Sequence, residues 1–242
     1  MKVSLFITCL ADIFFPQVGK NVVEILEHCG AEVDFPERQT CCGQPAYNSG
    51  YQKEAREAAK QMIQAFAHSE YVVTPSGSCA SMVKHEYVEM FRNDPEWQQK
   101  AVQLAAKTYE LTDFLVNVMR VDDLGSQCPR KATFHASCHM SRGLGIKQEP
   151  LLLLSRVRGL ELEALPHCED CCGFGGTFAA KMSPISQAMV DEKIRNIEST
   201  GADLLIGADL GCLMNIGGRL RRQGKDIEVM HVADVLAKGM RR

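Results

Sequence analysis

Residues 171–178 read Cys-Cys-Gly-Phe-Gly-Gly-Thr-Phe, and residues 41–43 read Cys-Cys-Gly. A lone cysteine precedes each doublet and another follows it, at nearly equal separations in the two halves of the chain. A repeat of this length is typical of a duplicated supersecondary unit. The repeated cysteines are Cys9, Cys41, Cys42 and Cys79 in the first half, and Cys138, Cys171, Cys172 and Cys212 in the second.

Strand-like and helix-like segments alternate around these cysteines. Val3–Thr8 is an apolar run of strand length, and Val18–His28 has apolar residues at helical spacing. In the second half, Lys131–His135 and Ile185–Ser199 show the same two patterns. Strands that alternate with helices of this length indicate β-α-β units. The expected fold class is therefore α/β, with two tandem related halves and mostly parallel sheets.

Two domains follow from the repeat, residues 1–120 and residues 130–242, joined by a linker at 121–130. Both halves close on a similar sequence, because residues 110–115 read Glu-Leu-Thr-Asp-Phe-Leu and residues 231–236 read His-Val-Ala-Asp-Val-Leu. This shared ending supports a full duplication of the unit.

The predicted strands place the repeated cysteines at one edge of each sheet. Each lone cysteine falls just past the carboxyl end of a predicted strand, and each doublet falls in a loop after a strand. Ligand sites in open parallel α/β sheets form outside these carboxyl ends. An iron–sulfur cluster is usually held by four thiolates. The eight repeated cysteines are therefore the expected metal ligands, four to a site.

The residues around the doublets suit a cofactor. Two neighbouring cysteines need an irregular turn to direct both sulfurs to one site, and a glycine with positive φ supplies it. Further glycines can direct N–H groups towards an anionic cluster. Histidines on either side of Cys138 can donate hydrogen bonds, although ordinary polar loop histidines are the alternative. The expected cofactor-binding residues are Gly43, Gly173, Gly175, Gly176, His135 and His139. Because the second repeat has more of these glycines and both histidines, it is predicted to hold the more robust of the two clusters.

Three of the eleven cysteines have no repeat partner. Cys29 and Cys128 are expected to be small buried core side chains, and Cys168 to be at most a spare ligand. No secretion signal is visible, so clustered cysteines indicate metal or redox chemistry in a reducing cytoplasm. The net charge of −3, without a basic block, argues against nucleic-acid binding. The sequence contains no run of 18 apolar residues, so no transmembrane segment is expected.

The two doublets, together with residues 135–139 (His-Ala-Ser-Cys-His), resemble the cysteine-rich CCG family. That family includes the B subunit of heterodisulfide reductase and the iron–sulfur subunit of glycolate oxidase. The resemblance covers nearly the whole chain. It implies an iron–sulfur electron-transfer subunit of a multi-subunit L-lactate or glycolate-type oxidoreductase, used in lactate utilisation and inactive alone. The implied partners are a ferredoxin-like iron–sulfur protein and a third subunit, in the cytoplasm or peripheral to the inner membrane.

The chain departs from the family pattern at its Cys-x-x-Cys ending, where Met82 and Asn215 replace the last cysteine. Each repeat keeps four of the five family cysteines, which implies one or two ordinary [4Fe-4S] clusters rather than a five-thiolate cluster. Zinc in one repeat stays an alternative, because Zn²⁺ also takes four thiolates. The alternative functions are a catalytic subunit of the heterodisulfide or thiol reductase type and a zinc-stapled interaction module.

Overall fold

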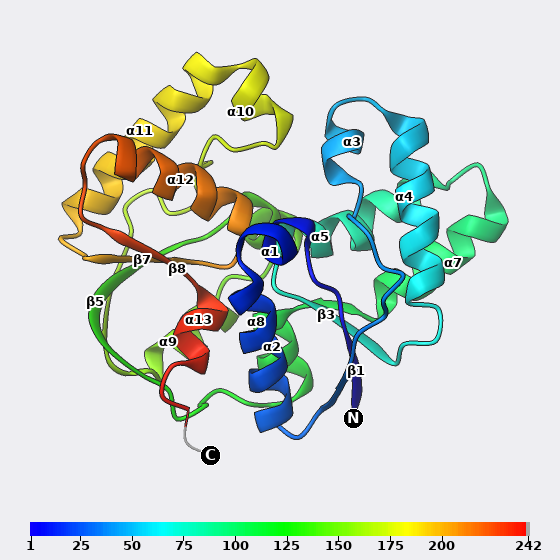
Figure 1. Ribbon diagram of the computed structural model, residues 1–242, viewed down its shortest axis with the longest axis horizontal. Coiled ribbons are helices and arrows are strands. Elements are labelled where there is room, and N and C mark those ends of the chain that lie inside the picture. The colour runs from blue at the N-terminus through cyan, green and yellow to red at the C-terminus, as the bar shows by residue number, and fades with distance from the viewer. Residues whose placement is uncertain (241–242) are drawn as a thin grey trace. The chain divides into compact units, whose positions relative to one another are not determined.

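The computed structural model describes residues 1–240 (Figure 1). They divide into two compact units, Met1–Phe114 and a second unit that begins at Leu115. Each unit contains one sheet of four parallel strands with helices between the strands. The predicted fold class, two tandem α/β halves with parallel sheets, is confirmed.

The first unit has the strand order β2-β1-β3-β4. Its strands are β1 (Lys2–Leu5), β2 (Glu32–Asp34), β3 (Tyr71–Thr74) and β4 (Thr108–Glu110). Its helices are α1 (Cys9–Phe14), α2 (Pro16–His28), α3 (Gln44–Asn48), α4 (Gln52–Ala65), α5 (Gly77–Ser81), the π-helical turn η1 (Met82–Glu86), α6 (Tyr87–Met90), α7 (Pro95–Ala106) and α8 (Leu111–Asp113). The chain passes into the second unit within the π-helical turn η2 (Phe114–Val118).

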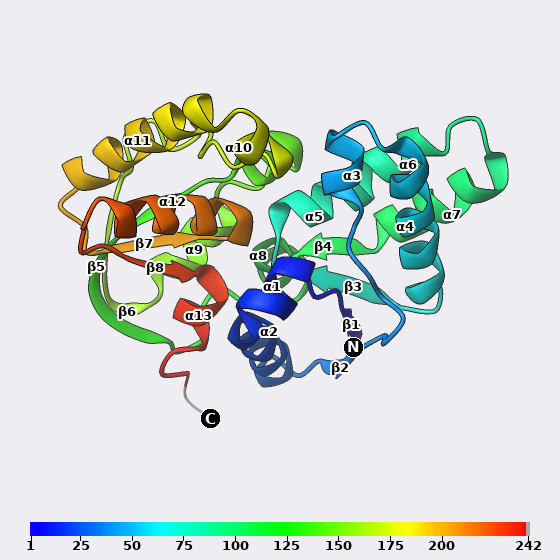
Figure 2. The ribbon, with the colours of Figure 1, turned by 45° about the horizontal axis from the view of Figure 1, so that its top comes forward.

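The second unit has the matching strand order β6-β5-β7-β8. Its strands are β5 (Gln127–His135), β6 (Arg158–Glu163), β7 (Leu204–Gly207) and β8 (Glu228–His231). Its helices are the π-helical turn η3 (His139–Gly143), α9 (Glu149–Ser155), α10 (Thr177–Lys181), α11 (Ser183–Ser199), α12 (Leu210–Arg222) and α13 (Val232–Ala237). Figure 2 shows α11 and α12 over one face of this sheet and α13 on the other.

Burial explains why these segments form a doubly covered sheet. Every residue of β7 is buried, as expected for a central parallel strand with helices on both faces.

Helix α2 of the first unit begins with Pro16, whose fixed φ suits the first helical position. Its apolar stripe, from Val18 to Leu26, is buried, and each such side chain contributes about 1.5–3 kcal/mol to folding. The helix ends at His28 with Cys29 as its cap, and the next residue, Gly30, has φ +84, which suits the turn out of the helix.

The prediction of a linker at 121–130 is wrong at its carboxyl end. The last residues of that segment lie in β5, where Gln127 pairs with Arg158 of β6. The pairing shifts register between Gln127 and Arg130, and Pro129 lies in this irregular stretch. A proline cannot donate a ladder hydrogen bond, so it is tolerated at such a bulge. Pro129 therefore indicated a loop, whereas the structure has a strand with a local shift in register.

The two cysteines that have no counterpart in the other repeat and were expected in the core differ in their burial. Cys128 lies in β5 and is completely buried, as predicted. Cys29 is only half-buried, so the prediction of a core position is wrong. It caps the carboxyl end of α2, beyond the last buried residue of that helix.

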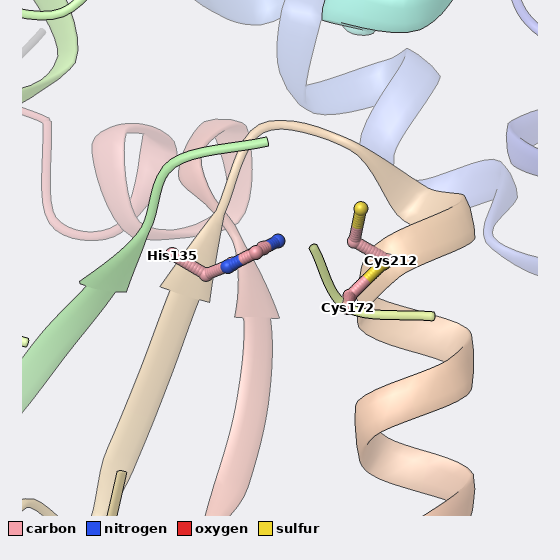
Figure 3. A group of neighbouring side chains, drawn as sticks. All are labelled: His135, Cys172 and Cys212. Atoms are coloured by element: carbon pink, nitrogen blue, oxygen red, sulfur yellow. The ribbon is translucent and has the colours of Figure 1, made fainter. Parts of the chain in front are cut away.

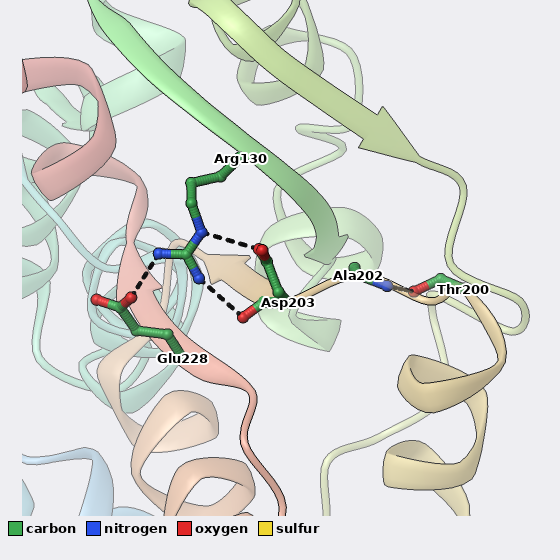
Figure 4. A network of polar contacts seen from close by, with 5 residues as sticks. All are labelled: Arg130, Thr200, Ala202, Asp203 and Glu228. Carbon is green, nitrogen blue, oxygen red and sulfur yellow. Dashed lines mark hydrogen bonds and ion pairs between the residues drawn. The ribbon is translucent and has the colours of Figure 1, made fainter.

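A polar network ties together the amino-terminal ends of three strands in the second unit (Figure 4). The Arg130 guanidinium donates to the Asp203 carboxylate (2.9 Å), the Asp203 carbonyl (3.1 Å) and the Glu228 carboxylate (2.8 Å). Just before β7, the Ala202 N–H donates to Thr200 Oγ1 at 3.1 Å. These contacts lie at the edge of the sheet opposite the cysteines, where they fix the strands without entering the candidate site.

Among residues 1–240, no helix has both the length and the apolar character that a membrane crossing requires.

Candidate metal centres

The first site lies where the chain leaves neighbouring strands. Cys9 begins α1 after β1, and Cys79 lies in α5 after β3. The doublet lies in the loop after β2. The sulfurs of Cys9 and Cys41 are 3.6 Å apart, and those of Cys42 and Cys79 are 3.5 Å apart. The four thiols of the first half therefore converge at the carboxyl edge of the sheet, where the chain turns to opposite sides from β1 and β3.

The back of the first site is apolar. Cys42 and Cys79 belong to the buried core of the first unit, together with Phe6, Met62 and Met82. One polar contact fixes the doublet in this surrounding, because the Tyr87 hydroxyl donates to the Cys42 carbonyl at 2.8 Å. Met82, which stands where the family pattern has its last cysteine, is a fully buried core residue.

The second site repeats this arrangement. Cys138 caps the turn η3 after β5, and Cys212 lies in the first turn of α12 after β7. The doublet lies in the loop after β6. The thiols of Cys138 and Cys171 are in hydrogen-bonding contact, as are those of Cys172 and Cys212. The four thiols of the second half thus also meet at the carboxyl edge of their sheet.

His135 contributes a nitrogen to the second site. It is the last residue of β5, and its side chain points towards Cys172 and Cys212 (Figure 3). The ligand atoms of these three residues all lie within 4.8 Å of one another. Burial, and secondarily the charge of Lys193, lowers the pKa of His135 to about 3, so the ring is neutral at ordinary pH. The second predicted histidine, His139, is half-buried, with Nδ1 3.7 Å from the Cys138 sulfur.

In each site one thiol has a lowered pKa, which favours its thiolate form. Hydrogen bonds from Cys42 and Cys9 lower the pKa of Cys41 to about 3. In the second site, hydrogen bonds from Cys138 and Cys172 lower the pKa of Cys171 to about 2. The donors show the opposite effect, and their pKa values are raised. In each site the first cysteine of the doublet is therefore favoured as the thiolate over the thiols that donate to it, and a bound cation would release the protons of those donors.

The glycines after the doublets have the predicted positive φ, +82 for Gly43 and +78 for Gly173. The Gly173 N–H donates to the Cys171 sulfur at 3.4 Å, and the Gly43 N–H makes the matching contact with Cys41. Gly175 and Gly176 also have positive φ. A Cβ on Gly175 would lie 2.8 Å from the Cβ of Phe178, so the tight loop requires a glycine there.

Lys193 is a buried cation that the sequence analysis did not identify. Its side chain lies on α11 and is 1% exposed, and its ammonium donates to the carbonyls of His167 (2.7 Å) and Cys168 (3.3 Å). His167 has φ +51, an unusual value for a residue with a Cβ. Lys193 therefore holds a strained loop just ahead of the doublet. Cys168 is half-buried in this loop, and its role as a spare ligand stays a prediction.

The matching position in the first half is Met62 on α4. Gly43 faces Ala55 and Ala58 on that helix, as Gly173 faces Ser186 and Met189 on α11, and this correspondence aligns Lys193 with Met62. The buried Met62 sulfur accepts a hydrogen bond from the Thr40 N–H at 3.2 Å. The corresponding position therefore accepts from the backbone through an uncharged sulfur in the first half and donates to the backbone through a cation in the second.

Asn215 also positions the second doublet. Its side-chain amide donates to the Cys172 carbonyl at 2.8 Å, which is the contact that Tyr87 makes with Cys42 in the first half. Asn215 stands where the family pattern has its last cysteine, so the departure from that pattern was the signal that marked this position.

The comparisons with known proteins agree with this geometry. The CCG cysteine-rich domain profile matches residues 3–84 and 132–217, which contain all eight repeated cysteines. Lactate utilization protein A 2 of Bacillus cereus (strain AH820) is 72% identical over 240 residues, covering 99% of each chain. Lactate utilization protein A of Geobacillus thermodenitrificans is 66% identical over 236 residues, covering 98% of each. The chain is thus a twin cysteine-rich α/β protein.

It belongs to the CCG cysteine-rich family and, within it, to the group of proteins named lactate utilization protein A. Among solved structures, a hypothetical protein from Helicobacter pylori superposes with a TM-score of 0.71 at 13% identity. The superposition covers 100% of this chain and 49% of the Helicobacter pylori protein. Because the sequence identity is so low, the likeness concerns the fold alone.

A substitution at Gly173 tests the close packing of the second doublet. An alanine Cβ there would lie 2.7 Å from the Ser186 carbonyl oxygen, at φ +78. Backbone strain of about 1–2 kcal/mol and overpacking of about 1–3 kcal/mol are expected to lower the free energy of unfolding of Gly173→Ala by about 2–5 kcal/mol. The control is Gly224→Ala, at φ +65 with no atom within 4 Å of the new Cβ. Urea unfolding followed by circular dichroism should show the larger loss for Gly173→Ala, and equal losses would contradict the packing argument.

Replacement of Lys193 by methionine, as in the first half, tests the hold on the loop before the doublet. The carbonyls of His167 and Cys168 lose their donor, so Lys193→Met should make amide hydrogen exchange in residues 167–172 about tenfold faster in metal-free protein. Lys225→Met, which removes a surface ion pair with Glu198, is the control and should leave this loop unchanged. Unaltered exchange of the loop in Lys193→Met would show that other contacts hold it.

Proposed function

We propose that this chain is an iron–sulfur electron-transfer subunit of a multi-subunit oxidoreductase that acts on L-lactate or a glycolate-type substrate. The observation that carries the proposal is the convergence of four thiols, from three separate connections, at the carboxyl edge of each sheet. A thiolate set of this size suits a [4Fe-4S] cluster. The names of the relatives support lactate utilisation as the process.

The eight repeated cysteines would hold the clusters, which supply one-electron transfer when bound. The protein contributes the surroundings. In the first site, Phe6, Met62 and Met82 exclude water and offer little compensation for added negative charge. In the second site, the Lys193 charge lies near the doublet and favours the more negative, reduced state, whereas the N–H contact from the glycine after the doublet is common to both sites. We therefore assign the higher reduction potential and the more robust cluster to the second site.

Partners are part of this proposal. Removal of two electrons from a hydroxy acid normally needs a cofactor such as flavin or NAD, and the sequence has no convincing dinucleotide fingerprint. The substrate would therefore be oxidised on a partner subunit, with a ferredoxin-like iron–sulfur protein as the other member. The letter A in the relatives' names fits a system of several components. We place the subunit in the cytoplasm, where its partners can bring it to the inner membrane.

Zinc is the second candidate, and the sulfur spacing favours it. Separations of 3.5–3.6 Å are close to the distance between ligands of one tetrahedral ion with metal–sulfur bonds of about 2.3 Å. A four-iron cluster is wider, so the doublets, which lie in loops, would move outward to accept it. A zinc-stapled interaction module, or zinc in one repeat alone, is therefore the alternative that metal analysis must separate from the main proposal.

A catalytic role of the heterodisulfide reductase type has less support. The family's fifth cysteine is replaced in both halves by a residue with another task. Met82 fills the core, and the Asn215 amide holds the Cys172 carbonyl. We therefore do not assign a substrate disulfide to either site.

Metal analysis of single cysteine variants tests the iron–sulfur assignment. The anaerobically purified protein is expected to be brown and to contain iron and sulfide. Cys42→Ser or Cys172→Ser should remove one centre and about half of the iron. Cys128→Ser, a change at a buried cysteine outside the sites, is the control and should keep the iron content. A colourless preparation with zinc alone, after iron-replete expression, would rule out the proposal in favour of the zinc module.

Activity measurements test the need for partners. The isolated chain, loaded with its metal centres, should not oxidise L-lactate or glycolate with an artificial electron acceptor, because two-electron oxidation normally needs a flavin or NAD and the sequence has no convincing dinucleotide fingerprint. Activity should appear with co-expressed partner subunits and should depend on Cys42 and Cys172. Oxidation of either substrate by the isolated chain would contradict the assignment as an electron-transfer subunit.

A further inference from the structure

His135 is a buried polar side chain without a polar partner. It is 1% exposed, and neither ring nitrogen has a hydrogen-bond partner. A buried polar group left unpaired costs about 1–3 kcal/mol, so native proteins rarely keep one without a reason. The unpaired ring lies at the second candidate metal site, and this position suggests what its partner is.

The ring is directed at the cysteine sulfurs. His135 ends β5, one of the two strands between which the second site opens, and its outer edge faces Cys172 and Cys212 (Figure 3). The ligand atoms of the three residues lie within 4.8 Å of one another. Imidazole nitrogen and thiolate sulfur are the two ligand types that Zn²⁺ and iron–sulfur centres use together.

The first half has no such nitrogen. Phe6 follows β1 three residues before Cys9, as His135 precedes Cys138 by three residues. Phe6 is fully buried and packs against Phe66, with ring centroids 5.8 Å apart. The same position therefore completes an apolar core in one half and presents an unpaired imidazole to the cysteines in the other.

We propose that His135 is a nitrogen ligand of the metal centre at the second site, beside Cys172 and Cys212. The proposal rests on the function proposed above only in requiring a bound metal at this site. The two sites then differ in kind, with thiolates alone at the first and thiolates with one imidazole at the second. A four-iron cluster or a tetrahedral ion takes four protein ligands, so His135 would take the place of one of the four repeated thiolates. Where histidine replaces cysteine as a ligand of iron–sulfur centres, the reduction potential rises, so this ligand set strengthens the assigned difference between the sites.

The experiment uses the full chain with the double change Cys41→Ser/Cys42→Ser, which leaves only the second centre. Protein labelled with ¹⁵N-histidine and unlabelled protein are purified without oxygen, reduced and compared by pulsed electron paramagnetic resonance. A histidine nitrogen bonded to iron should give a strong hyperfine coupling that changes with the label. His135→Phe, which copies the first half, should abolish the coupling, and His139→Phe should retain it.

Each outcome decides the inference. Bound iron without a strongly coupled histidine nitrogen would overturn it and leave the iron–sulfur function standing. A coupling that disappears in His139→Phe and persists in His135→Phe would also overturn it. If the second site holds zinc, X-ray absorption at the zinc edge should show a nitrogen neighbour among the sulfurs, lost in His135→Phe or His135→Asn. A second site that binds no metal would reject both this inference and the proposed function. If the His135 variants do not fold, the labelled Cys41→Ser/Cys42→Ser protein with and without His139→Phe gives the answer, because a coupling that persists without His139 leaves His135 as the histidine at the site.

Discussion

The structure depends on one topological constraint: the carboxyl ends of parallel strands lie at the same edge of a sheet. In each unit the chain runs from a central strand to one side and then to the other, with the orders β2-β1-β3-β4 and β6-β5-β7-β8. The crevice at this reversal is where three connections can bring side chains together. Cysteines far apart in the sequence meet there, and no local segment could assemble the site alone.

The same scaffold is lined differently in the two halves. Phe6 and Met62 make the first site part of a hydrophobic core, whereas His135 and Lys193 bring an imidazole and a cation to the matching places in the second. Charge is costly to bury unless it is paired or hydrogen-bonded. A change in the charge of a bound centre would therefore be opposed in the first half and compensated in the second, although the backbones follow one plan.

Local patterns were enough to predict the fold and the convergence of the cysteines. The duplication, the alternating elements and the positive φ of Gly43 and Gly173 all follow from residue types and spacing. The departure from the family pattern marked Asn215 but not its role, and nothing marked Lys193, because their partners are backbone carbonyls of loops whose course no pattern shows. Pro129 was misleading, since it interrupts a strand without ending it, and Cys29 lies too near a helix end to be buried.

Each compact unit contains the complete set of cysteines for its own site. During synthesis, the first site can form once the first unit, Met1–Phe114, has folded, before the second doublet exists. If both sites bind metal as proposed, loading and loss of the two centres would be separate events, and singly loaded chains would be distinct species with their own colour, charge and lifetime. A preparation with a fractional metal content would be a mixture of such species, and its average would describe none of them.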